Sequence, residues 1–137
     1  MITRIKPFAT QADIHDFLCA KPLQYLEKVG ERGLKLSGGE KQRMAITRAL
    51  LKQSKIMCFD EATSALDNET EAEVQKAIDD ISHLSNRPTT LIIAHRLSTV
   101  RNCDTIIVMK DGTVEEQGTH EELISGHEGL YKKLWGF

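Results

Sequence analysis

Residues 37–42 have the composition that a phosphate-binding turn needs. Ser37, Gly38 and Gly39 stand at the start of a stretch with helical periodicity. The first N–H groups of a helix have no intrahelical partners and lie at its positive end, so an oxyanion can approach them closely. We predict a phosphate site here, with Gln42 near enough to assist. Taken alone, a glycine pair at a helix start more often marks an ordinary turn.

A second group of residues has the chemistry of a metal site and a general base. The apolar run 55–60, typical of a buried parallel strand, ends in the adjacent carboxylates Asp60 and Glu61. A carboxylate at the end of a buried strand needs a metal, a water shell or a hydrogen-bonding neighbour. Such a pair can serve a divalent cation and a base at one site, although a helix cap or an exposed loop is the simpler explanation. Together with the phosphate turn, the pair suggests nucleotide hydrolysis.

The elements around these residues alternate between strands and helices. Helices are predicted at 38–52 and 68–84, the second capped by Asn68 and Glu71. Apolar runs at 89–94 and 104–110 predict further strands; Asp111 and Gly112 form a hairpin turn before an edge strand at 113–117, and a capping box at Thr119 opens the terminal helix. We therefore expect an α/β fold in which three apolar strands form a parallel sheet with helices on its faces.

Composition and charge exclude several classes of protein. The 137 residues are 40% hydrophobic and 28% charged, the balance of a globular domain. Eighteen basic and twenty acidic side chains are interspersed for a net charge of -2, so nucleic acid is not expected as a partner. No apolar run approaches the roughly 20 residues of a membrane span. The three cysteines form no metal-binding spacing, indicate a reducing compartment, and include Cys58, which is expected in the core.

The order of these motifs resembles the second half of the nucleotide-binding domain of ATP-binding cassette (ABC) transporters. LSGGEKQR at 36–43, the run ending in Asp60-Glu61, and SALD at 64–67 correspond to the signature motif, the Walker B strand and the D-loop of that family. The resemblance is strongest to half-transporter exporters of the mitochondrial iron–sulfur and heavy-metal type. It implies a P-loop NTPase-like parallel sheet flanked by helices. Residues 1–12 would be a frayed leader or upstream remnant, 13–52 a partial helical subdomain and 53–137 the C-terminal part of the RecA-like core.

The resemblance also assigns roles to the matched positions. Glu61 would be the general base, Asp60 the Mg²⁺ residue, and His95, directly after the apolar run 89–94, the switch that contacts the γ-phosphate. Ser37 and its glycines would clamp the γ-phosphate of ATP held on a second, head-to-tail cassette, and Asp67 would contact that cassette. The residues implied to bind nucleotide are Ser37, Gly38, Gly39, Gln42 and Asp67.

One departure from the family pattern limits what the chain can do alone. No G-x-x-x-x-G-K-[ST] loop occurs in the sequence, and neither the adenine-stacking aromatic residue nor the Q-loop glutamine has a counterpart. Because the Walker A loop supplies most of the phosphate binding in such sites, we expect the isolated chain to bind ATP poorly and to be inactive. Residues 29–33 resemble the X-loop of exporters, which implies a transmembrane partner and a cassette facing the cytosol or mitochondrial matrix.

Two rival interpretations stay open. The chain could be a truncated fragment that has no ATPase activity of its own and docks on an intact cassette or a transmembrane partner. It could instead belong to a DNA-repair or chromosome-organising ATPase, in which the signature and Walker B are also distant from Walker A. Those proteins join the two through long heptad coils, and this sequence has no sustained heptad.

Overall fold

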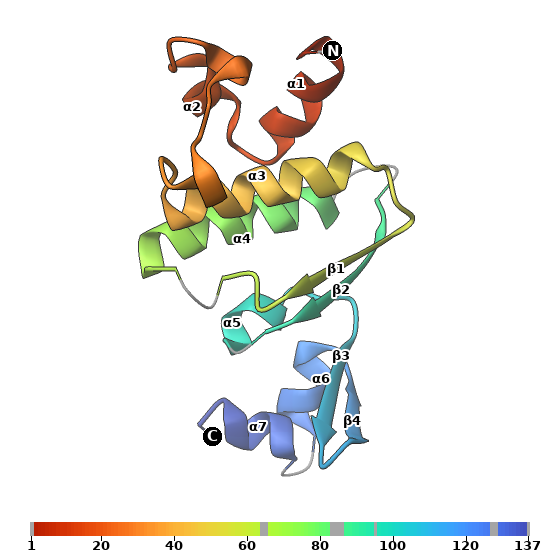
Figure 1. Ribbon diagram of the computed structural model, residues 1–137. Coiled ribbons are helices and arrows are strands. Elements are labelled where there is room, and N and C mark those ends of the chain that lie inside the picture. The colour runs from red at the N-terminus through yellow and green to blue at the C-terminus, as the bar shows by residue number, and fades with distance from the viewer. Residues whose placement is uncertain (1, 64–65, 83–86, 95, 127–128, 137) are drawn as a thin grey trace. The chain divides into compact units, whose positions relative to one another are not determined.

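The structure is a computed structural model that describes residues 2–63, 66–82, 87–94, 96–126 and 129–136 (Figure 1). The chain divides into two compact units, Met1–Ile93 and Ala94–Phe137, and each is described by itself. The helices of the first unit are α1 (Ile2–Gln11), α2 (His15–Cys19), α3 (Gly38–Leu51) and α4 (Asn68–Ser82), with short 3₁₀ turns at Gln24–Leu26 (η1) and Glu31–Gly33 (η2). Its strands are β1 (Ile56–Asp60) and β2 (Thr89–Ile93).

The core of the first unit lies where α3, α4 and α1 meet. Figure 1 shows α3 and α4 side by side, and α1 contacts both. Ile46 and Leu50 of α3 share one buried cluster with Val74 and Ile78 of α4. These residues recur three to four positions apart, so each helix turns one apolar stripe toward the core. The helix predicted at 38–52 is confirmed within one residue.

Helix α1 lies within residues 1–12, for which the sequence predicted a frayed leader or an upstream remnant and no helix. Its ten residues include Pro7, a residue that is unfavourable inside a helix. The helix forms nonetheless, because Ala9 is fully buried and Phe8 packs against the core cluster. Tertiary contacts therefore decide this element, as they do for most short helices.

Strands β1 and β2 are parallel neighbours, with Ile56 opposite Thr89 and Asp60 opposite Ile93. Helix α4 connects them, so strand, helix and strand form the expected crossover unit. Met57 and Phe59 face the core, but the alternate residues of β1 are exposed, Ile56 by 68%. The expectation that Cys58 lies in the core is therefore wrong: within the described residues only one face of this two-stranded sheet is covered.

The second unit contains α5 (Leu97–Val100), β3 (Ile106–Lys110), β4 (Thr113–Gly118), α6 (His120–Ser125) and α7 (Leu130–Leu134). The third apolar strand, β3, does not extend the parallel sheet as predicted; it pairs antiparallel with β4. The turn between β3 and β4 is tight, and in it Asp111 and Gly112 both have positive φ, at 50° and 80°. Such turns join antiparallel neighbours. The predicted hairpin and the Thr119 capping box are confirmed, and the fold is mixed α/β as expected.

Candidate nucleotide site

The predicted phosphate turn forms a capped helix start. The Ser37 hydroxyl accepts a hydrogen bond from the Glu40 N–H at 3.2 Å, and the Glu40 carboxylate accepts one from the Ser37 N–H at 2.7 Å. This reciprocal capping box fixes the first turn of α3. The N–H groups of Gly38 and Gly39 belong to the set that helix geometry leaves without intrahelical partners. Ser37 and Gly38 are exposed, so a ligand can reach this end of α3 from solvent.

The two glycines of this turn also permit close packing within the chain. A Cβ at Gly39 would lie 2.1 Å from Cγ2 of Thr70, and one at Gly38 would lie 3.0 Å from Cδ2 of Leu66. The start of α3 therefore packs directly against the start of α4. Thr70 was not singled out from the sequence, and no sequence pattern signals this contact, because it joins residues about thirty positions apart.

Asp67 caps helix α4 in place of the predicted Asn68. Its carboxylate accepts a hydrogen bond from the Thr70 N–H at 3.2 Å. Hydrogen bonds from the Thr70 side chain and backbone hold the pKa of Asp67 below its usual value of 3.8. Asp67 is exposed and follows Leu66, which lies against Gly38. The structure thus brings an ionised carboxylate to the same region as the turn formed by Ser37, Gly38 and Gly39, which we call the signature turn.

One turn further along α3, the side chains of Gln42 and Arg43 are less exposed than Ser37. Gln42 is half-buried. Arg43 forms an ion pair with Glu73 of α4 at 2.5 Å, and its side chain is only 12% exposed. Arg43 therefore links the two helices that meet at this turn.

Asp60 and Glu61 lie at the carboxyl end of β1, where ligands bind in parallel α/β sheets. Both residues are exposed, so the argument that burial forces a partner on Asp60 does not apply in this structure. The Glu61 N–H donates to the Ile93 carbonyl at 2.8 Å, which extends the β1–β2 pairing by one step. Glu61 has a φ of 46°, in the left-handed region that non-glycine residues seldom adopt. Strained backbone of this kind is frequent at functional sites.

The carboxylate pair suits one kind of metal site. Among the described residues, no three histidine, cysteine, aspartate or glutamate side chains gather into a metal cluster. Mg²⁺ commonly uses one or two carboxylates and completes its octahedral shell with waters and substrate phosphates. Exposed Asp60, with Glu61 beside it, fits that mode and not an all-protein cage. His95, the predicted γ-phosphate switch, lies outside the described residues, as do residues 64 and 65 of the D-loop motif.

Comparison with known proteins agrees with this geometry. The ABC transporter family profile matches residues 4–64. A heavy metal tolerance protein of Schizosaccharomyces pombe is 52% identical over 93% of this chain, which spans 15% of that relative. The ABC transporter ATM1 of Toxoplasma gondii is 51% identical, and this chain spans 11% of its length. A solved bacterial Atm1-family ABC exporter with ATP bound superposes with a TM-score of 0.82 at 46% identity, covering 98% of this chain and 23% of the exporter.

The chain therefore belongs to the ABC transporter family, and it is a part of that family's ATP-binding domain. Its relatives include exporters of the mitochondrial and heavy-metal type, as the sequence predicted. The chain spans only a small fraction of those relatives. Among the helices that the structure describes, none is long and apolar enough to cross a bilayer.

Proposed function

We propose that this chain acts as the C-terminal part of an ABC exporter ATPase, which couples ATP binding and hydrolysis to transport across a membrane. The observation that carries the proposal is the pair of exposed carboxylates at the carboxyl end of β1, with the Glu61 backbone held by Ile93. In the proposed site Asp60 holds Mg²⁺ and Glu61 accepts a proton from the attacking water. His95, two residues after Ile93 in the sequence, contacts the γ-phosphate.

A second part of the proposal concerns the signature turn. Ser37, Gly38 and Gly39 bind the γ-phosphate of ATP held by another cassette, assisted by Gln42, and Asp67 contacts that cassette. The support is the capped, solvent-accessible start of α3 and its packing against the segment that carries Asp67. Because the sequence contains no Walker A loop, the nucleotide cradle comes from residues outside this sequence. In the assembly a transmembrane domain anchors the cassette, which faces the cytosol or the mitochondrial matrix.

The bacterial Atm1-family exporter offers a direct test, because 98% of this chain superposes on 23% of it. Residues 1–137 would replace that part of the exporter, and the ATPase rate of the chimaera would be measured in lipid vesicles. We expect hydrolysis in the chimaera, and its loss with retained ATP binding in Glu61→Gln, because the amide cannot accept the proton. Glu69→Gln, an exposed carboxylate in the first turn of α4, is the matched control and should keep the rate. Undiminished hydrolysis in Glu61→Gln would reject the assignment of the base.

One observation favours a second candidate, in which the chain docks on a cassette without hydrolysing ATP. The outer face of β1–β2 exposes four side chains of apolar character, Ile56, Cys58, Leu91 and Ile93. A face of this kind suits packing against the remainder of an ATP-binding domain. The ATPase rate of the chimaera separates the candidates, because an inactive chimaera would favour a chain that only docks. Titration of the purified chain with a fluorescent ATP analogue adds a second check, since micromolar affinity would contradict that candidate.

A further inference from the structure

We propose that Cys19 is a reactive thiol that exchanges with small-molecule disulfides, and that His15 takes up the thiol proton. Nothing in the nucleotide site uses either residue, and the proposal does not depend on ATP hydrolysis. Cys19 ends helix α2 and is exposed, while His15 begins the same helix and is half-buried. Residues four apart in a helix lie on one face, so the backbone itself holds the two side chains together.

The geometry places the thiol against the imidazole ring. The Cys19 sulfur lies 3.5 Å from His15 Nδ1 and 3.7 Å from Nε2. A ring nitrogen at this distance is a base within reach of the thiol proton, and the thiolate is the nucleophile in disulfide exchange. Exposure at the helix end lets a small disulfide reach the sulfur from solvent.

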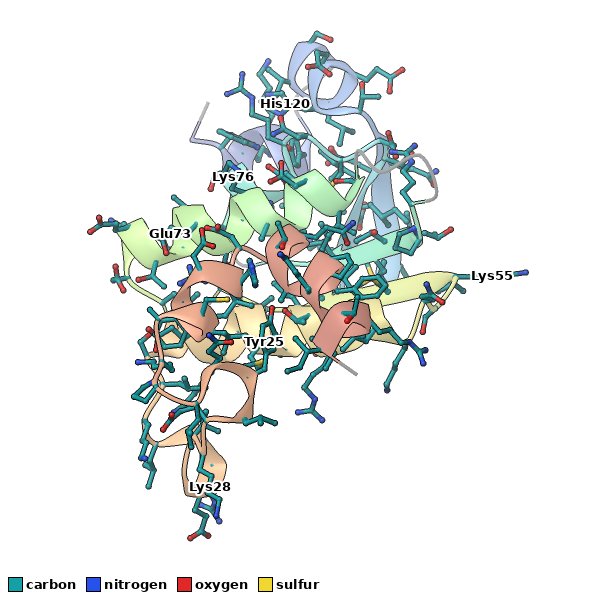
Figure 2. The ribbon with its side chains drawn as sticks, turned by 90° about the horizontal axis from the view of Figure 1, so that it is seen from above. Tyr25, Lys28, Lys55, Glu73, Lys76 and His120 are labelled. Atoms are coloured by element: carbon teal, nitrogen blue, oxygen red, sulfur yellow. The ribbon has the colours of Figure 1, made fainter. Side chains whose placement is uncertain are left out.

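Tyr25 orients the imidazole through one of its ring nitrogens, Nδ1. Its hydroxyl is 2.8 Å from His15 Nδ1, and the two ring centroids are 5.9 Å apart. The residue lies in η1, and its side chain is labelled in Figure 2. Burial raises the pKa of Tyr25, and negative charge at Cys19 and Asp16 raises it further, so its hydroxyl stays neutral. A neutral phenol can donate to an imidazole or accept from an imidazolium, and therefore holds the ring in both protonation states.

The reaction balances without a further oxidant. The Cys19 thiol gives its proton to a ring nitrogen of His15, and the thiolate attacks one sulfur of the disulfide. The S–S bond of the small molecule breaks as the new S–S bond to Cys19 forms. The departing half leaves as a thiolate, which takes the proton from His15. One sulfur of the small molecule is reduced from the disulfide to the thiol level, the Cys19 sulfur is oxidised from the thiol to the disulfide level, and a thiol reductant reverses the step.

The other two cysteines provide an internal reference. Cys58 is exposed like Cys19, but among the described residues its thiol has no hydrogen bond to a basic group. Cys103 is half-buried. If exposure alone set the reaction rate, Cys19 and Cys58 would react at similar rates. The imidazole of His15 beside Cys19 predicts that Cys19 reacts faster.

The experiment measures the modification rate of each cysteine in the purified 137-residue chain with hydroxyethyl disulfide, a neutral probe, by peptide mass spectrometry. We expect Cys19 to react at least about tenfold faster than Cys58. This rate ratio is smaller than the acceleration of about 100-fold to 10,000-fold that a positioned base supplies in enzymes. His15→Gln should bring Cys19 to within about threefold of Cys58. His120→Gln is the matched control, because His120 also contacts a tyrosine hydroxyl, that of Tyr131 at 3.0 Å, and should leave the ratio unchanged.

A second measurement covers the case in which His15→Gln does not fold. The unsubstituted chain in concentrated urea loses the helix that pairs the two side chains, so the ratio of the Cys19 and Cys58 rates should fall toward one. Dithiothreitol should restore the free thiol in the native sample. Equal rates in the native chain, or a ratio that is the same in native and denatured samples, would overturn the proposal.

Discussion

Substitution of Gly39 by alanine tests whether the signature turn is built for close packing as well as for phosphate. The added Cβ would lie 2.1 Å from Cγ2 of Thr70, whereas carbon atoms prefer a separation of about 3.5 to 4.0 Å. Thr70 cannot move away freely, because its side chain and backbone both bond to Asp67. Overpacking of this kind costs about 1–3 kcal/mol, and alanine returns up to about 1 kcal/mol of helix propensity. We expect Gly39→Ala to lower the free energy of unfolding by about 1–2 kcal/mol.

A double-mutant cycle isolates the contact. Thr70→Ser removes Cγ2 and keeps the hydroxyl, and the next atom that the new Cβ meets is Cβ of residue 70, at an ordinary 3.6 Å. In the Thr70→Ser background, Gly39→Ala should be neutral or stabilising by up to about 1 kcal/mol. The difference between its effects in the two backgrounds is the coupling energy of residues 39 and 70, which we expect to be about 2 kcal/mol. Urea unfolding followed by circular dichroism measures all four chains.

The control for this cycle is Gly38→Ala, which meets only the flexible end of Leu66 and should cost less than about 1 kcal/mol. If Gly39→Ala destabilised both backgrounds equally, the Thr70 contact would not be the reason for glycine here.

Two further predictions concern helix α4. Glu73→Ala removes the partner of Arg43, whose side chain is 12% exposed; because Glu73 itself is 51% exposed, urea unfolding should show a loss of only about 1 kcal/mol. Asp80→Ala breaks an exposed pair with Lys76 on the same helix and should leave the urea midpoint unchanged. Figure 2 labels Glu73 and Lys76, both on α4. The lowered pKa of Asp67 means that its cap stabilises the fold above pH 3.8 and that this contribution is lost as the pH falls through the pKa in the folded chain. The difference in urea midpoint between the unsubstituted chain and Asp67→Asn should therefore be constant from pH 7 to 5 and shrink below pH 3.8; a difference that grew with acid would contradict this sign.

The sequence by itself determined the features that depend on local order along the chain. The helix after Ser37 follows from its capping box and apolar period, the turn at Asp111 and Gly112 follows from residues that tolerate positive φ, and the motif order from residue 36 to 67 identified the family. Each of these depends on neighbours within a few positions. Such patterns can be read without knowing what packs against them.

Only the tertiary structure decided the features that depend on contacts between distant residues. Helix α1 forms because Ala9 is buried against other elements, and β3 shares no hydrogen-bonded ladder with β1 or β2. Cys58 is exposed because, among the described residues, only one face of the β1–β2 sheet is covered. The same holds for Gly39, whose lack of a side chain permits contact with Thr70. The burial of a side chain and the order of strands in a sheet depend on contacts with distant parts of the chain, so no local sequence pattern specifies them.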